Sequence, residues 1–477
     1  MAKFRTKSQG TKTVNLAGGE AFKESPKLEL VSLLLTSFVG NKFYESAGGQ
    51  LDRLTNLVSA ISDKKFVAKA AIFARTEYGM RSITHALLAE LTKVVKGEPW
   101  TKEAIAKAIY RPDDALEVLA YYGQKYGKPF PNSLKKGLAL GLQKFNAYQL
   151  AKYRGEGSSV KMVDLLNLVH LKPNKDNAET FEKLMKGTLK STDTFESKLT
   201  KAGQDAAKFD DSEKEEKLAE LKGAAWADLI KEKKIGYFAL LRNLRNIEKD
   251  APEVLDEALV MLKDEKLIKK SLVMPFRFNT ARHEVTNRKT VEALSDAIEI
   301  AMVNVPKFDG KTLIALDCSG SMSGKPMEIG SLFAAVLYKA NPDAAFMSFG
   351  SDAQYKVFNS KDSVLSIAKQ MQRSAGGTNF HAIFEQANQP YDRIIILSDL
   401  QGWMGYDAPT GSLAIYEKRM AVKSFIYSFD LNGYGTLQFP QDRVFAITGF
   451  SEKVFDLFKA LETDRNALIS KIEAIEL

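Results

Sequence analysis

Cysteine and histidine are scarce in this sequence of 477 residues, which contains one cysteine, Cys318, and four histidines. A single cysteine excludes a disulfide within the chain and fits a reducing compartment, so we expect a cytoplasmic protein. Zinc sites need several cysteine or histidine ligands at characteristic spacings. Because His85, His283 and His381 show no such spacing with one another, no zinc site is predicted.

Long apolar runs and common enzyme motifs are absent as well. No run of about 18 apolar residues is present, so neither a transmembrane helix nor a membrane partner is expected. The first residues, MAKFRTKSQGTKTVNLAGG, lack the apolar core of a secretory signal. Neither a phosphate-binding Walker loop nor a Gly-x-Ser-x-Gly nucleophile elbow occurs. The sequence therefore favours a binding protein and predicts that the chain is not an enzyme.

Charge is distributed unevenly along the chain. The net charge is +9, and residues 1–160 contain 25 Lys and Arg against 14 Asp and Glu. Residues 301–477 contain 17 Lys and Arg against 19 Asp and Glu, so this region is slightly acidic. A basic region is typical of proteins with a phosphate-rich partner such as a nucleic acid. Lysines on a solvated helix surface would give the same count, so both interpretations stay open.

Before about residue 305, apolar residues recur at helical spacing. We expect short helices, with Asp63 as the N-cap of one and Pro112 in the first turn of another. Their succession predicts an α-solenoid of antiparallel helix pairs. Residues 186–223 are charged and poor in large apolar groups, which predicts either an exposed excursion or helices with one solvated face. The predicted helices lie within residues 27–40, 50–79, 82–97, 101–111 and 112–127.

After residue 305 the pattern alternates between apolar strands and helices. Such alternation predicts a mostly parallel, doubly wound sheet covered by helices on both faces. The fold class is therefore α plus α/β, with a helical domain over residues 1–304 and an α/β domain over residues 305–477. Strands are predicted at residues 311–319, 344–350, 355–358, 393–399, 422–430 and 443–449.

Five oxygen-bearing side chains are predicted to meet at one edge of this sheet. Asp317 ends the first strand and precedes Ser319 and Ser321, Asp399 ends another strand, and Thr378 lies in the loop SAGGTNF. Parallel strands carry functional groups where they end at their carboxyl edge. Carboxylate and hydroxyl oxygens suit a hard divalent cation such as Mg²⁺. The alternative is that the serines only cap the following helix and no metal binds.

In this order, the Asp-x-Ser-x-Ser string, the Gly-Gly-Thr loop and the strand-terminal aspartate resemble the metal-ion-dependent adhesion site of von Willebrand factor A domains. The resemblance implies that Asp317, Ser319, Ser321, Thr378 and Asp399 hold the metal, directly or through water. A partner's carboxylate would fill the open position. An alternative function is therefore a metal-dependent adaptor that tethers a partner such as an exoribonuclease. A nuclease centre is disfavoured, because nucleases cluster carboxylates around two metals.

Six stretches of the helical part resemble, in the same order, the TROVE module of the Ro ribonucleoproteins in their bacterial or phage form. The resemblance implies a monomeric ring of HEAT-like helical repeats that is closed by the A domain. Such a ring would bind small noncoding Y RNA on its outer basic surface and single-stranded 3′ ends of misfolded or structured RNA through its centre, in RNA quality control. The stretches are ARTEYGMRSITHALLAEL (74–91), RPDDALEVLAYY (111–122), LKKGLALGLQKFNAYQLAKYR (134–154), DLLNLVHLKP (164–173), FALLRNLRNI (238–247) and PFRFNTA (275–281).

The same resemblance implies that Lys152 and His170 contact RNA, although a core histidine is an alternative for His170. Lys135, Lys136 and Arg154 are further candidates on charge alone, and a solvated helix face explains the first two equally well. Two other residues of a matching stretch, Arg81 and His85, are instead expected to hold a helix junction together.

Overall fold

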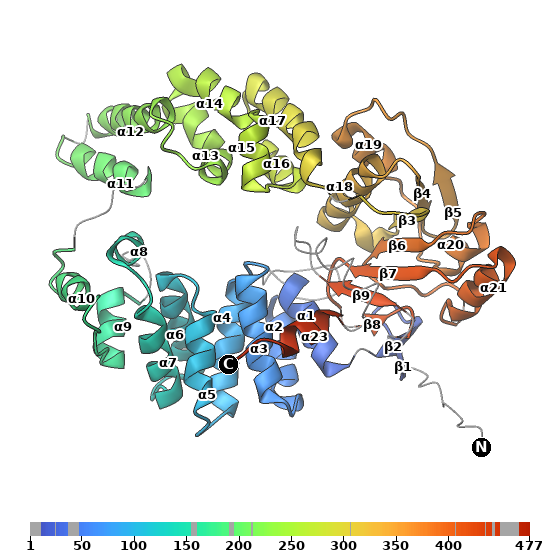
Figure 1. Ribbon diagram of the computed structural model, residues 1–477, viewed down its shortest axis with the longest axis horizontal. Coiled ribbons are helices and arrows are strands. Elements are labelled where there is room, and N and C mark those ends of the chain that lie inside the picture. The colour runs from blue at the N-terminus through green and yellow to red at the C-terminus, as the bar shows by residue number, and fades with distance from the viewer. Residues whose placement is uncertain are drawn as a thin grey trace.

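The helices and strands of the chain follow one another around a closed path in the computed structural model (Figure 1). None of the helices among the described residues is both long and apolar enough to cross a membrane. The structure describes residues 11–23, 25–36, 47–153, 160–189, 195–210, 213–305, 307–405, 407–434, 436–440, 444–448 and 467–477.

The first part of this path consists of stacked helices. They are α1 (Pro26–Thr36), α2 (Ala47–Ala60), α3 (Lys64–Thr76), α4 (Ser82–Val94), α5 (Trp100–Ala108), α6 (Pro112–Tyr126), α7 (Asn132–Leu142), α8 (Ala147–Lys152), α9 (Met162–Val169), α10 (Ala178–Met185), α11 (Phe195–Ala206), α12 (Lys214–Lys231), α13 (Tyr237–Asp250), η1 (Pro252–Val254), α14 (Leu255–Leu262), α15 (Glu265–Ser271), α16 (Pro275–Arg282), α17 (Arg288–Ala301) and η2 (Met302–Asn304).

Alternate helices pack on one another, which confirms the predicted solenoid of helix pairs. α3 packs against α1 and α5, and α5 against α7, while α4 packs against α2 and α6. The close approach of α5 and α7 requires glycine, because a Cβ on Gly137 would lie 2.7 Å from the Cβ of Ile105. α4 is buried on nearly all sides, from Ile83 to Thr92. Its apolar sequence therefore fits a helix enclosed by its neighbours.

The local signals read from the sequence act as expected. The side chain of Asp63 accepts a hydrogen bond from the backbone N–H of Phe66 at 3.0 Å and so caps α3. Pro112 begins α6, where its missing N–H costs no helical hydrogen bond. Within the charged region 186–223, α11 and the start of α12 form helices with exposed faces. The second of the two alternatives for that region is therefore confirmed.

The second part of the path contains the predicted doubly wound sheet. Its strand order is β5-β4-β3-β6-β7-β9, and the neighbouring strands are parallel except for the antiparallel pair β4–β5. The elements are β3 (Thr312–Asp317), η3 (Gly320–Met322), α18 (Lys325–Ala340), β4 (Ala344–Phe349), β5 (Ala353–Lys356), α19 (Val364–Met371), α20 (His381–Gln386), β6 (Arg393–Ser398), α21 (Thr410–Met420), β7 (Phe425–Asp430) and β9 (Phe445–Thr448).

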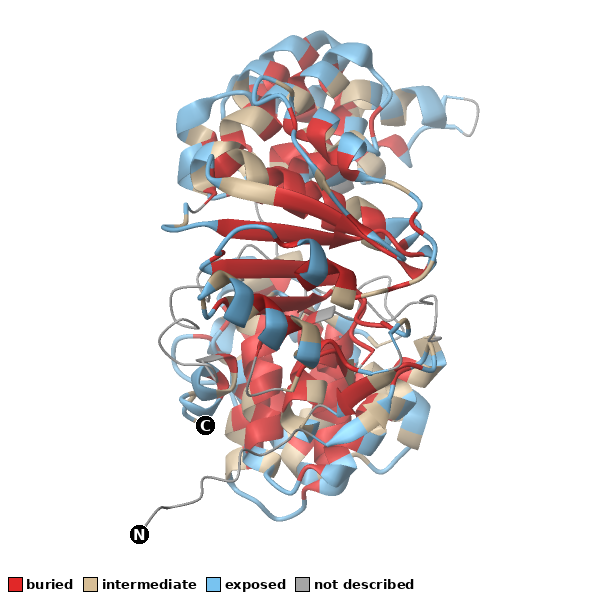
Figure 2. Cartoon of the chain, turned by 90° about the vertical axis from the view of Figure 1, so that its right-hand side faces the viewer, coloured by how far each residue is buried: buried red, intermediate tan, exposed pale blue. Residues whose placement is uncertain are grey.

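Apolar side chains bury both faces of this sheet, as the red strands of Figure 2 show. On β3, Ile314 and Leu316 join a core that continues into the stacked helices, whereas Leu313 and Ala315 face a second core. At one junction of the two parts, α16 packs on α18 and α17 on α19. The rings of Phe276 and Phe333 lie 5.8 Å apart there. The helices and the sheet thus share one continuous core at this junction.

Both ends of the chain cross to the opposite part and close the path. Near the N-terminus, β1 (Lys12–Val14) pairs with β2 (Glu20–Lys23), and β2 pairs with β8 (Thr436–Leu437) from the sheet part. Near the other end, α23 (Ala467–Glu473) packs on α3. The domain boundary between residues 304 and 305 stays a prediction. Near the N-terminus the chain pairs with the sheet part, and near the C-terminus it packs on the helical part, so each end contacts the domain to which the prediction did not assign it.

Candidate metal centre and nucleic-acid interface

Four of the five predicted metal ligands lie together at the carboxyl edge of the sheet. Asp317 ends β3, and its Oδ1 accepts a hydrogen bond of 2.9 Å from the backbone N–H of Ser319. The hydroxyl oxygens of Ser319 and Ser321 are 3.3 Å apart. Asp399 follows β6 and lies close enough to Asp317 and Ser321 to interact with both. All four residues are buried.

The fifth predicted ligand, Thr378, lies in the adjacent loop and is also buried. Two backbone hydrogen bonds join this loop to the serine loop: Gly320 N–H donates to the oxygen of Gly376 at 3.1 Å, and Ala375 N–H to the oxygen of Cys318 at 3.0 Å. The backbone oxygen of Thr378 accepts hydrogen bonds from the loop that follows Asp399. The three loops therefore form one connected unit.

The two carboxylates of this unit are buried, and burial disfavours their charged forms. Burial raises the pKa of Asp317 above its ordinary value, and burial together with the charge of Asp317 raises the pKa of Asp399. Asp399 Oδ2 is buried without a hydrogen-bond partner among the residues that the structure describes. A divalent cation would neutralise both groups and give this oxygen a ligand role. The residues present fit a hard cation such as Mg²⁺.

Hydroxyl groups must complete such a site. Among the described residues, no group of three or more His, Cys, Asp or Glu side chains is placed to hold a metal ion. Ser319, Ser321 and Thr378 would therefore supply oxygens beside the two aspartates, with water in the remaining positions. The lone Cys318 points elsewhere, since its thiol contacts the backbone oxygen of Met371, and burial raises its pKa to about 11.

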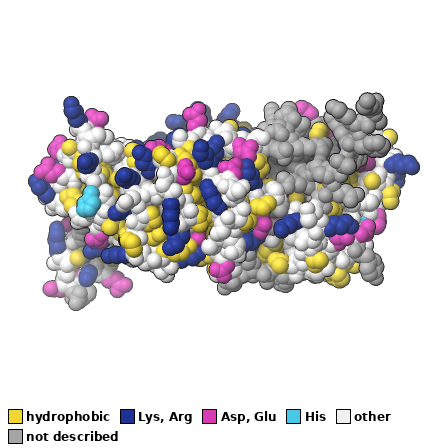
Figure 3. Space-filling model, turned by 90° about the horizontal axis from the view of Figure 1, so that it is seen from below, with side chains coloured by type: hydrophobic (Ala, Val, Ile, Leu, Met, Phe, Trp, Pro, Cys, Tyr) yellow, Lys and Arg dark blue, Asp and Glu magenta, His cyan; other side chains and the backbone are white. Residues whose placement is uncertain are grey.

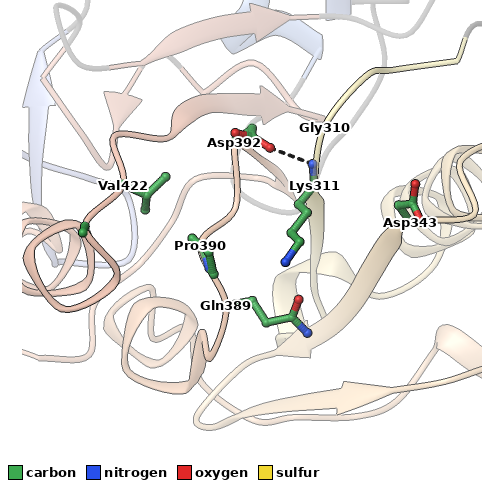
Figure 4. A pocket seen from close by; sticks show the side chains of 8 residues that line it. Gly310, Lys311, Asp343, Gln389, Pro390, Asp392 and Val422 are labelled. Carbon is green, nitrogen blue, oxygen red and sulfur yellow. Dashed lines mark hydrogen bonds between the residues drawn. The ribbon is translucent and has the colours of Figure 1, made fainter.

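At the opposite edge of the sheet, an open cavity of about 620 Å³ lies near the starts of β3 and β6 (Figure 4). Lys311, Asp343, Gln389 and Asp392 line it, and the backbone N–H of Lys311 donates to Asp392 Oδ2 at 2.8 Å. These residues are exposed. The cavity is therefore separate from the predicted metal centre.

The predicted RNA-contacting residues of the helical part belong to three helices. Lys135, which is half-buried, and Lys136, which is exposed, lie on α7, and Lys152 ends α8. His170 caps the end of α9 in a left-handed conformation with a φ of 48°, and it is exposed. The alternative of a core histidine is therefore wrong. Arg154 lies outside the described residues.

Lysines and arginines are scattered over the outer face that includes α5 and α7, with apolar side chains and some Asp and Glu side chains between them (Figure 3). Some of these lysines already bind backbone oxygens: Lys107 Nζ donates to Glu476 at 2.9 Å and Lys144 Nζ to Ala106 at 2.7 Å. Burial lowers the pKa of Lys144. The remaining exposed cations make this face able to meet an anionic partner.

A buried ion cluster supports the helices beside Lys152. The carboxylate of Asp114, which has no exposed surface, accepts hydrogen bonds from Arg75 at 2.9 and 3.1 Å and contacts His85 Nε2 at 3.0 Å. Burial alone would raise the pKa of Asp114, but His85 and Arg75 outweigh it and hold that pKa well below its usual range. The structural role expected for His85 is thereby confirmed, and Arg81 joins the same cluster through Asp113 at 2.7 Å.

Sequence reasoning missed the aromatic residues beside this cluster. Tyr110 is 57% exposed, and Tyr153 lies with its ring centroid 4.2 Å from the guanidinium carbon of Arg111. The signal available in the sequence was the pairing of each tyrosine with an adjacent basic residue, in Tyr110–Arg111 and Lys152–Tyr153.

Comparisons with known proteins place the helical part in a family. The model of the TROVE domain matches residues 40–221 and 158–307. A relative named RNA-binding protein RO60, from Deinococcus radiodurans, is 29% identical over 145 residues, which are 28% of this chain and 27% of that protein. Telomerase protein component 1 of Rattus norvegicus is 23% identical over 139 residues, 27% of this chain and 5% of that protein. The matched region thus spans about a quarter or less of each of these relatives.

The fold has a counterpart among solved structures. The crystal structure of the Deinococcus radiodurans RO (RSR) protein matches with a TM-score of 0.62 over 94% of this chain and 99% of that chain, at 18% sequence identity. This likeness confirms the fold, a helical ring joined to a von Willebrand A-like α/β domain. Because the TROVE model covers more than half of the chain, the chain belongs to the TROVE-domain family.

Proposed function

We propose that the protein binds RNA and acts as a ribonucleoprotein component in RNA quality control or processing. The observation that carries this proposal is the match of the TROVE model across residues 40–307, in a chain whose positive excess lies in its first third. The relative from Deinococcus radiodurans carries RNA binding in its name. Lysine and arginine contacts to phosphates would supply most of the affinity.

The ring would bind two kinds of RNA at two places. A small noncoding Y-type RNA would bind the outer basic surface, with Lys152 and His170 as contacts and Lys135 and Lys136 as further cations. Single-stranded 3′ ends of misfolded or structured RNA would bind through the ring, because an unpaired strand is narrower than a duplex and exposes its bases. We further propose a monomeric, cytoplasmic protein without catalytic activity.

A second role is proposed for the sheet part, as a metal-dependent adaptor. The observation that favours it is the buried Asp399 Oδ2, which has no hydrogen-bond partner within the described part of the chain. With Mg²⁺ held by Asp317, Ser319, Ser321, Thr378 and Asp399, an open coordination position would accept a carboxylate from a partner such as an exoribonuclease. The two roles are compatible, since the helices would hold RNA while the metal centre holds a protein.

Binding of a labelled structured RNA at several salt concentrations tests the RNA proposal. The logarithm of the affinity should fall linearly with the logarithm of the salt concentration, and Lys152→Ala should make this slope less steep by about one. Lys361→Ala, which removes an exposed lysine of the sheet part, is the matched control and should leave the slope unchanged. Binding that is weak and independent of salt in all three proteins would refute the proposal.

A further inference from the structure

The ring of Tyr110 lies against Arg75, and more than half of this residue is exposed. Tyr110 lies in the connection between α5 and α6, and the guanidinium carbon of Arg75 lies 5.3 Å from its ring centroid. Arg75 is 4% exposed and is fixed by its two hydrogen bonds to Asp114. The backbone N–H of Tyr110 donates to the same carboxylate at 3.0 Å. Arg75 therefore supports the ring of Tyr110, while 57% of Tyr110 remains exposed.

A second tyrosine, Tyr153, is held in a similar way by the residue that follows Tyr110. The guanidinium of Arg111, the residue after Tyr110, lies 4.2 Å from the ring centroid of Tyr153. Arg111 is itself fixed by two hydrogen bonds to Asp113, at 2.9 and 2.7 Å. Lys152 Nζ lies 5.4 Å from the same ring. Each ring thus rests on an arginine that a carboxylate holds in place.

The surroundings of the two rings are positively charged. Arg75, Arg81, Arg111 and Lys152 lie in this cluster, whereas its carboxylates are Asp113 and Asp114. A surface that pairs aromatic rings with excess cations is what an unpaired nucleic-acid strand requires, because its bases stack on rings and its phosphates meet the cations.

We propose that Tyr110 and Tyr153 form a stacking platform for unpaired nucleobases of RNA, with Lys152 beside Tyr153 to meet the phosphates. The proposal rests on the RNA-binding function proposed above and adds a mode of recognition to it. Bases within a duplex have both faces covered, so the platform accepts only single-stranded or splayed-out nucleotides. Stacking tolerates any base, so the platform selects unpaired RNA and not a particular sequence.

Binding of a single-stranded RNA oligonucleotide and of a blunt duplex to the full chain tests this platform. Tyr110→Ala should weaken binding of the single strand by about 5- to 150-fold, the range expected for one base on one aromatic ring. Tyr110→Phe should restore it, because the ring is kept. The salt slope should stay unchanged, since no charge is lost. The blunt duplex should bind Tyr110→Ala and wild type equally.

Phe209→Ala is the matched control, because Phe209 is 42% exposed and has Lys217 6.0 Å from its ring centroid. It should bind the single strand like wild type. If Tyr110→Ala were misfolded, fluorescence of 2-aminopurine placed in the oligonucleotide would test the wild-type protein directly: quenching on binding supports stacking. Absence of quenching, or equal binding by wild type and both Tyr110→Ala and Tyr153→Ala, overturns the platform. Failure of wild type to bind any RNA would instead refute the proposed function.

Discussion

Asn15, in the connection between β1 and β2, donates a hydrogen bond of 2.5 Å from its side-chain Nδ2 to the backbone oxygen of Gly402. Gly402 belongs to the loop that follows the predicted metal ligand Asp399. The oxygen Oδ1 of the same asparagine accepts hydrogen bonds from Ala17 and Gly19, each at 3.0 Å. One buried side chain near the N-terminus therefore fixes its own turn and the loop of the metal centre.

Gly19→Ala should detach this turn from the metal loop. An added Cβ would lie 2.1 Å from the oxygen of Gly402 and 2.5 Å from the Cα of Trp403, and both are backbone atoms. We expect a loss of about 1–3 kcal/mol in the free energy of unfolding and faster amide hydrogen exchange in residues 399–404. Gly411→Ala, where no atom lies within 4 Å of the added Cβ, should match wild type. Unchanged exchange in both variants would contradict the contact.

Mg²⁺ should raise the melting temperature of the wild-type protein and have no effect on Asp399→Asn. At a concentration of 100 times its dissociation constant, the ion would add about 2.7 kcal/mol to the free energy of unfolding. Without metal, Asp399→Asn should be more stable than wild type, because it removes a buried negative charge beside Asp317. Asp343→Asn, at the other edge of the sheet, should respond to Mg²⁺ like wild type. An equal response of Asp399→Asn would exclude this metal centre.

Acid should weaken the fold through Asp114. Its pKa lies below the ordinary value in the folded state, so the unfolded chain binds a proton more readily. The stabilisation of the folded state by ionised Asp114 is fully present above about pH 4, and it is lost as the pH falls further. Asp114→Asn should lower the free energy of unfolding by about 3–5 kcal/mol at pH 7, because Arg75 loses its buried partner.

Chemical denaturation at a series of pH values measures this effect. Below pH 4, wild type should lose more stability than Asp114→Asn. The control is Asp256→Asn, whose partner Lys289 forms an exposed ion pair at 3.0 Å with 75% of the Asp256 side chain accessible, and this change should have little effect. If the free energy of unfolding fell equally with pH in wild type and Asp114→Asn, Asp114 would not be the source of the acid sensitivity.

Packing of α5 on α7 should fail in Gly137→Ala. The added Cβ would lie 2.7 Å from the Cβ of Ile105, so the two helices would have to move apart. We expect a destabilisation of about 1–3 kcal/mol by thermal unfolding. Gly203→Ala on α11, where no atom lies within 4 Å of the new Cβ, should be neutral or slightly stabilising. A loss of stability in Gly203→Ala equal to that in Gly137→Ala would reject the packing argument.

The sequence predicted those features that depend on neighbouring residues. The helix start at Pro112, the cap at Asp63 and the strands around Asp317 and Asp399 follow from local periodicity and turn chemistry, and the structure has them in place. The convergence of Asp317 and Asp399 was predictable too, because parallel strands end at a common edge.

Features that depend on distant contacts were not predictable in this way. β1, β2 and β8 have two to four residues each, too few to show a period, and β2 finds its partner in β8 only after the chain has closed on itself. The contact of the Tyr110 ring depends on Arg75, which comes from α3 and lies 5.3 Å from the ring centroid. His170 gave no sign in sequence of its exposed, left-handed position at the end of α9.

RNA binding by the helical part is the central claim, and binding of one structured RNA with and without a single-stranded 3′ tail tests it most directly. Wild type would be compared with the double variant Lys152→Ala/His170→Ala and with Asp317→Ala at fixed salt. We predict tighter binding of the tailed RNA, with weaker binding by the double variant and wild-type binding by Asp317→Ala. Equally weak binding of both RNAs by all three proteins would contradict the account.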